Sequence, residues 1–126
     1  MPYKIMMSIV CIVPLIFSLA FVAIPEFFVL QWYPSAEGLA LEIAITHRYD
    51  MAGLLFMVVC FAFLSRNVEG VDNQKAILLG AAIAFSAMCA VIISIGLFRG
   101  VPLDIPPMIA TGTIAALSFW SRSKLS

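Results

Sequence analysis

Charged side chains are scarce in this sequence. Asp, Glu, Lys and Arg make up 11% of its 126 residues, against about 25% in an ordinary soluble domain. Hydrophobic residues make up 63%, where about 45–50% is usual. The seven basic and seven acidic residues cancel, so no net positive charge is available to attract nucleic acid. The composition therefore predicts an integral membrane protein that contacts the lipid bilayer and no nucleic acid.

Side chains that bind metals or cofactors are equally few. The chain has one histidine, His47, and three cysteines, each inside an apolar run: Cys11, Cys60 and Cys89. A zinc site or a disulfide framework needs closely spaced ligands, and neither a C-x-x-C pair nor a second histidine is present. We therefore expect no metal, no cofactor and no catalytic residues, and we interpret the cysteines as small buried hydrophobic side chains.

Four apolar segments predict the fold. A helix needs about 20 mostly apolar residues to cross a hydrocarbon core of about 30 Å. The segments that meet or approach this length are residues 5–24, 43–64, 76–98 and 105–120. We therefore predict an all-α membrane protein, a single domain over residues 1–126 with four transmembrane helices in an antiparallel bundle.

Prolines and one aspartate predict where some of these helices begin and end. The last segment is short, but Asp104 is a suitable N-cap, and Pro106 and Pro107 fit the first turn of a helix. Pro14 should bend the first helix, and Pro25 should end or bend it.

The positions of lysine and arginine predict the orientation. With a cytoplasmic N-terminus, five of the seven basic residues fall on the cytoplasmic side: Lys4, Arg66, Lys75, Arg122 and Lys124. Only Arg48 and Arg99 fall on the other side. The positive-inside rule then places both termini in the cytoplasm, and we expect the membrane to be a bacterial inner (plasma) membrane.

The first segment has a second interpretation. Lys4, the apolar stretch after it and Ser18-Leu19-Ala20 are similar to a signal peptide with a small-x-small cleavage site. However, the apolar run of about 20 residues is longer than the usual 7–15, and cleavage would leave Phe27 and Phe28 on a free tail. An uncleaved span explains more of the sequence, although the sequence alone does not decide between them.

A polar cluster marks the start of the second span, in "ITHRYDMAGLLF" at residues 45–56. Its candidate functional residues, with one from the end of the third span, are Glu42, His47, Arg48, Asp50 and Arg99. His47 and Asp50 are three residues apart and so share a helix face. A neighbouring carboxylate favours a charged imidazole, which makes a proton relay or an ion-coupled gate chemically feasible. The structural alternative is that Asp50 pairs with His47 or Arg99 and closes the outer end of the bundle.

Arg48 points to a different face of the same helix. One interpretation is that its long side chain reaches the lipid headgroups. The other is an ion pair with an acidic residue predicted on the same side of the membrane, namely Glu26, Glu37, Glu42 or Asp104.

Small residues recur at helical spacing in the third and fourth spans. Gly80 and Ala84 lie four apart in the third span, and Gly112 and Ala116 lie four apart in the fourth. Such rows mark contact faces between helices in lipid. We predict that the third and fourth spans pack together and that small-residue faces also bind partner helices.

The overall layout resembles a group of proteins. With its "HRYDMAGLLF" segment, its short "SRNVEGVDNQKAILLG" connection and its small-residue spans, the chain is similar to uncharacterised small four-helix bacterial inner-membrane proteins. This resemblance implies a fold and no site. Small multidrug-resistance transporters are similar in size, but they carry an acidic residue inside the first span, which this chain lacks. Four-helix quinone-linked thiol oxidoreductases need paired exposed cysteines, and a haem-binding four-helix cytochrome usually needs two histidines.

These patterns lead to three functional hypotheses. The first is a non-enzymatic integral membrane protein, an accessory or assembly subunit that binds partner helices. The second is a small homo-oligomeric transporter or channel, with Glu42, His47 and Asp50 lining its outer vestibule. The third is a membrane enzyme acting on a lipid or quinone, which would need more convergent polar groups than this chain has.

Overall fold

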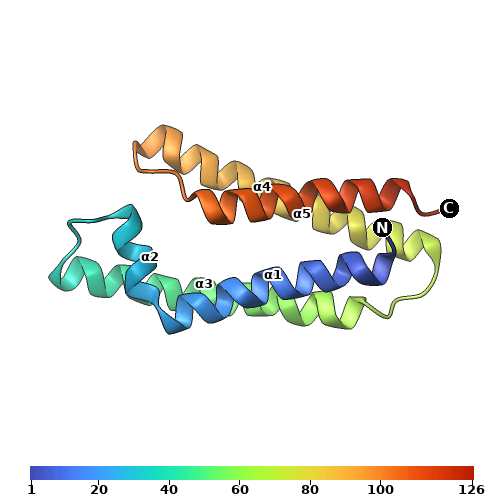
Figure 1. Ribbon diagram of the computed structural model, residues 1–126, viewed down its shortest axis with the longest axis horizontal. Coiled ribbons are helices and arrows are strands. Elements are labelled where there is room, and N and C mark those ends of the chain that lie inside the picture. Colours follow the sequence, from blue (N-terminus) through green and yellow to red (C-terminus); the bar gives the residue numbers. More distant parts are fainter.

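The computed structural model describes all 126 residues, and its regular elements are all α-helices. Five helices follow one another along the chain (Figure 1): α1 (Tyr3–Ala23), α2 (Pro25–Trp32), α3 (Gly38–Ser65), α4 (Val71–Arg99) and α5 (Ile105–Ser123). The predicted all-α class is confirmed. Three of the helices, α1, α3 and α4, are long and apolar enough to cross a membrane, which indicates a membrane protein. The fourth span, in α5, stays a prediction.

Proline and glycine residues set several of the helix ends. α1 continues through Pro14 and ends at Ala23, and Pro25 opens the short helix α2. Asp104 occupies the N-cap position of α5, with the two prolines in the first turn, as predicted. α3 and α4 each begin five residues before the predicted spans, because helical turns continue past the charged residues that limit those spans, such as Glu42 and Lys75.

The four long helices form two antiparallel hairpins. α1 packs along α3, and α4 packs along α5. Both chain termini and the α3–α4 connection lie at one end of the molecule, which we call the terminal end (Figure 1). α2 and the α4–α5 connection lie at the opposite end, which we call the α2 end. This up-and-down order of the long helices is the antiparallel order predicted from the sequence.

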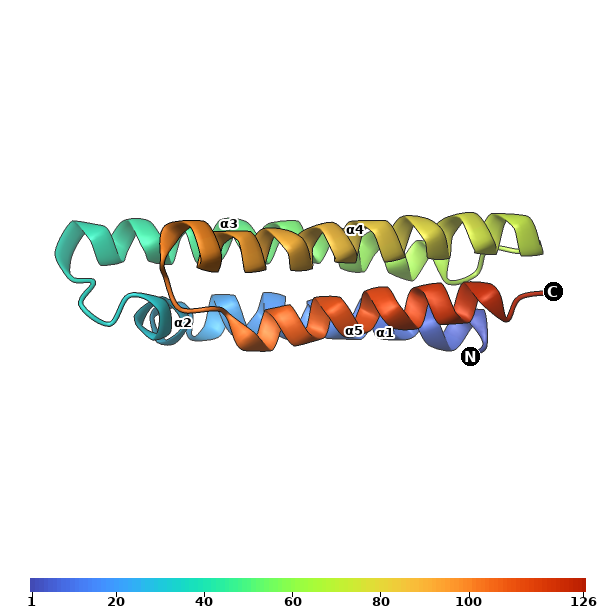
Figure 2. The same cartoon turned by 90° about the horizontal axis from the view of Figure 1, so that it is seen from above.

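The two hairpins are joined mainly along one side. Figure 2 shows α3 and α4 in one layer and α1 and α5 in the other. α1 contacts α5, whereas α3 and α4 make almost no contact with each other. One cluster of buried side chains joins the hairpins: Tyr3, Met6, Met7, Val10, Ala62, Leu78 and Ile114. Since α3 and α4 are not packed together, the layer that they form has a gap.

Close approach and buried hydrogen bonds hold the first hairpin together. The hydroxyl of Ser18 donates to the carbonyl oxygen of Ala52 at 2.8 Å. The phenol of Tyr3 donates to the carbonyl oxygen of Ser65 at 2.7 Å. Helices in lipid associate through such contacts, because burying apolar side chains from water contributes little there.

The second hairpin uses only part of the predicted small-residue interface. Gly112 faces α4, and a Cβ at this position would lie 3.6 Å from the Sγ of Cys89. Ala116 is exposed on α5, and Gly80 and Ala84 are exposed on α4. Within this chain Gly80, Ala84 and Ala116 are therefore not covered by a neighbouring helix, and their role in helix packing stays a prediction. Small residues occur on more than one face of each helix, and their spacing does not reveal which face is covered.

The contact at Gly112 leads to a prediction about stability. Replacing Gly112 by Leu should lower the free energy of unfolding by about 1–3 kcal/mol, because the larger side chain would push against Cys89 and separate α4 from α5. Replacing the exposed Ala116 by Leu on the same helix should change it by less than about 0.5 kcal/mol. Denaturation in detergent micelles, followed by circular dichroism, measures both. Equal effects of the two variants would contradict the assigned contact.

Candidate functional site

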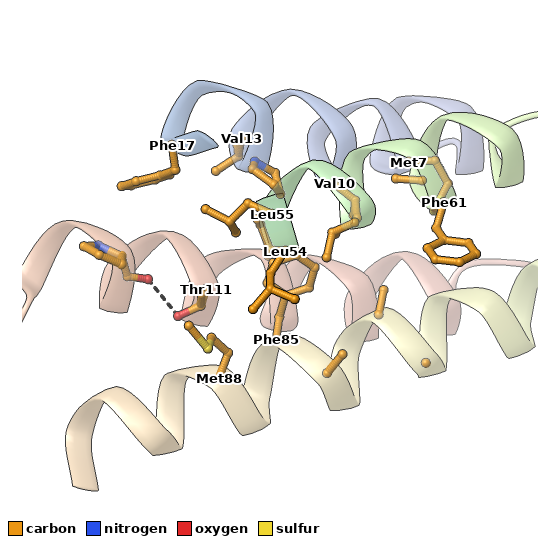
Figure 3. A pocket seen from close by; sticks show the side chains of 18 of the residues that line it. Met7, Val10, Val13, Phe17, Leu54, Leu55, Phe61, Phe85, Met88 and Thr111 are labelled. Atoms are coloured by element: carbon orange, nitrogen blue, oxygen red, sulfur yellow. Dashed lines mark hydrogen bonds between the residues drawn. The ribbon is translucent and has the colours of Figure 1, made fainter. Parts of the chain in front are cut away.

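An apolar groove lies between the two hairpins. Its volume is about 450 Å³, and 17 of its 22 lining residues are hydrophobic. Figure 3 shows side chains from all four long helices turned toward this space, with Val10, Leu54 and Phe85 among them. The polar side chains in the lining are the hydroxyls of Ser65 and Thr111. The Thr111 hydroxyl already donates to the carbonyl oxygen of Pro107 at 2.8 Å, so the groove offers almost no free polar group.

The groove opens between α3 and α4. Lining residues from α1 and α5 are mostly buried or half-buried and form its floor. By contrast, Leu54 and Phe61 on α3 are 62% and 67% exposed, and Gly80 and Ala84 on α4 are exposed as well. In a membrane this opening would face other helices or lipid.

Part of the α4 wall of the groove is formed by small residues. It includes Gly80, Ala81 and Ala84, and a Cβ added at Gly80 would meet no atom within 4 Å. Small residues of this kind let a second helix backbone approach closely. The volume is about three times that of an apolar cavity of about 150 Å³ that holds one benzene ring. The groove thus has room for two or three large apolar side chains.

A buried cluster with one arginine closes the α2 end. Arg48 is 6% exposed, and its guanidinium carbon lies 5.2 Å from the ring centroids of both Phe21 and Trp32. A cation over an aromatic face is attracted by the negative centre of the ring. The single side-chain hydrogen bond of Arg48 runs to the Sδ of Met51 at 3.9 Å. α1, α2 and α3 therefore meet around one positive charge.

Asp104 brings the second hairpin into this cluster. It lies in the α4–α5 connection and is 7% exposed. Burial raises the pKa of the Asp104 carboxyl above its usual value, while the Arg48 charge and the Trp32 indole N–H oppose that rise. The N–H of Trp32 is buried and makes no hydrogen bond, so its effect on the carboxyl comes without a completed hydrogen bond. Buried charges of opposite sign reduce each other's desolvation cost, so Arg48 and Asp104 attract each other across the two hairpins without a direct ion pair.

The structure separates Arg48 from the rest of the predicted polar cluster. Glu42, His47 and Asp50 are exposed on α3, and Arg99 is exposed at the end of α4. No basic nitrogen and carboxylate oxygen lie within 4.0 Å of each other, so the expected pairs of Asp50 with His47 or Arg99 are not formed. Of the two interpretations of Arg48, the structure contradicts the reach toward headgroups and favours attraction to Asp104.

The sequence contained only a faint signal for this cluster. Arg48 shares a helix face with the buried Ala52 and Val59, four and eleven residues later. Phe21 and Trp32 lie in other helices, at separations that no local pattern links to Arg48. The sequence did indicate Asp104, which was one of the four acidic residues predicted as possible partners of Arg48. Nothing in the sequence pattern predicted the groove.

No group of three His, Cys, Asp or Glu side chains converges where a metal ion could bind. Comparisons with protein-family models, with curated proteins and with solved structures find no match. The groove and the buried charges at its α2 end are the features of this fold that bear on function.

The raised pKa of Asp104 predicts a pH-dependent stability. Between the usual value of 3.8 and the raised value, the folded protein binds more protons at this group than the unfolded protein does. The free energy of unfolding should therefore fall as pH rises through that window. Asp104→Asn, which cannot ionise, should remove this dependence. Thermal unfolding in detergent from about pH 4 to about pH 8 measures it.

Glu42→Gln is the matched control, because it removes an exposed carboxylate of α3 that is not part of the buried cluster. It should leave the pH dependence as in the unmodified protein. A slope that Asp104→Asn does not change would show that this carboxyl is not perturbed in the fold.

Proposed function

We propose that this protein is a non-enzymatic integral membrane protein, an accessory or assembly subunit that binds a transmembrane helix of a partner chain in the groove between α3 and α4. The observation that carries this proposal is the open apolar groove with its small-residue wall on α4.

A helix suits this groove better than a polar substrate does. The lining has two hydroxyl groups and no charged side chain, so it supplies no convergent groups for chemistry on a bound molecule. Gly80 and Ala84 allow close approach of a helix backbone, which is how helices associate in lipid. Large apolar side chains on that helix would fill the space between the hairpins. These features support a binding function over an enzymatic one.

The proposal includes four spans and a defined orientation. α5 has 19 residues, or about 28 Å of helix, which is close to the hydrocarbon thickness of about 30 Å. It packs along α4, which supports its position beside a spanning helix. The terminal end holds both termini and the α3–α4 connection, the segments that carry five of the seven basic residues. The positive-inside rule supports a cytoplasmic terminal end in a bacterial inner membrane.

Filling the groove tests the proposed partner binding. Gly80→Leu and Ala84→Leu should each reduce the bound partner about tenfold or more, because the new side chain would occupy the space that a second helix needs. The measurement is native mass spectrometry of the tagged protein extracted from its own membrane in a mild detergent. The expected complex of the unmodified protein has a fixed stoichiometry.

Ala90→Leu is the matched control for these variants. Ala90 is exposed on α4 and is not part of the groove lining, so the same enlargement should leave the complex intact. A complex that survives both groove variants would refute the groove as the binding site. Circular dichroism confirms that every variant remains folded.

A homo-oligomeric transporter is the second candidate. The observation in its favour is that Glu42, His47 and Asp50 are all exposed on α3 toward the α2 end, where they could line a path between copies. Since the groove of one chain is apolar, a polar path would have to form between chains.

The transporter hypothesis has its own test. Asp50→Asn should abolish pH-dependent ion flux in proteoliposomes, because an amide in place of the carboxylate cannot exchange a proton with His47. The folded bundle should be preserved, since Asp50 is exposed. Flux that is unchanged by the substitution, or absent from the unmodified protein, would remove this candidate.

A further inference from the structure

We infer that the helix received by the groove is α3 of a second copy of this chain, in a symmetric dimer in which each α3 packs against α4 of the other copy. This inference rests on the proposed function, because it identifies the partner that the groove binds.

The two walls of the groove are complementary in size. The α3 wall presents Leu54 and Phe61, which are large and mostly exposed. Between the larger Ile77 and Phe85, the α4 wall presents Gly80 and Ala84, which are small and exposed. Large side chains of one helix fit above small residues of another, where the backbones approach closely. Within one chain these walls stand apart, because α3 and α4 make almost no contact.

The same two walls are also complementary in charge. Asp50 lies one turn before Leu54 and eleven residues, or three turns, before Phe61, so it continues their face of α3. Arg99 lies eleven residues after Met88, another groove residue, and so continues the groove face of α4. Both charged side chains are exposed and have no oppositely charged group within 4.0 Å. Each wall thus ends in an unpaired charge of opposite sign.

Two-fold symmetry brings these features together. With the axis along the membrane normal, the α2 ends of both copies lie on the same side of the membrane. Rotation by half a turn then sets α3 of each copy against α4 of the other, as in any interface that uses the same face twice. Asp50 would meet the partner subunit's Arg99, and the pair would form twice. Attraction between such charges is stronger at the edge of a bilayer than in bulk water.

A charge exchange tests this dimer. Asp50→Lys and Arg99→Glu should each weaken self-association about tenfold or more, because each puts like charges opposite one another. The double variant Asp50→Lys/Arg99→Glu should recover association to within about threefold of the unmodified protein, since both pairs are restored with their signs reversed. The measurement is energy transfer between donor-labelled and acceptor-labelled copies, diluted in vesicles of phosphatidylcholine and phosphatidylglycerol.

Glu42→Lys is the matched control. It changes the same charge on the same helix, but Glu42 lies eight residues before Asp50 and twelve before Leu54, spacings that place it on another face of α3. It should alter association by less than about twofold. A double variant as weak as the single variants, or single variants that associate normally, would overturn the inference.

The Gly80→Leu variant separates this inference from the proposed function. If it abolishes energy transfer between copies, the groove binds a helix and that helix comes from a second copy. If the protein is monomeric in vesicles while Gly80→Leu still releases a different polypeptide, the inference is wrong and the proposed function stands. If Gly80→Leu changes neither self-association nor any complex from the native membrane, both are wrong.

Discussion

Inside a bilayer, helices gain little free energy by moving apolar side chains from lipid into a contact with another helix, because lipid is as apolar as leucine. They associate where backbones come close or where polar groups meet. This constraint explains why the chain forms two tight hairpins, each with close contacts such as Ser18 with Ala52 or Gly112 with Cys89. It also explains why the contact between the hairpins is limited. Apolar side chains alone give α3 and α4 no reason to close on each other.

The hairpins are therefore held at a few defined places. One is the buried cluster around Met6 and Leu78. The other, at the α2 end, is the charge of Arg48, which would be costly to bury without Phe21, Trp32 and Asp104 around it. Because the groove lies between the hairpins, these attachments set its width. Attraction between two buried charges is weak support for stability, but it can favour one arrangement of the hairpins over another.

The sequence predicted those features that depend on local composition. Spanning helices are visible as apolar runs, the end of α1 is visible in Pro25, and the start of α5 is visible in Asp104 with its prolines. The short helix α2 was not predicted. The burial of Arg48 was not predictable in this way, because it depends on aromatic rings in two other helices. The small-residue rows had the same limit. Gly80 and Gly112 have the same type of neighbours at the same spacing, yet one faces the groove and the other faces α4.

Physical reasons favour a helix over a lipid chain as the proposed occupant of the open groove. Acyl chains can fill any apolar groove in a bilayer, but each chain loses conformational freedom when it is held in place. A helix is already ordered, so its binding costs less ordering entropy for the same contacts. Its backbone can also approach Gly80 and Ala84 more closely than their larger neighbours would permit. Small residues turned outward, on a chain that does not cover them itself, are best explained by a helix that does.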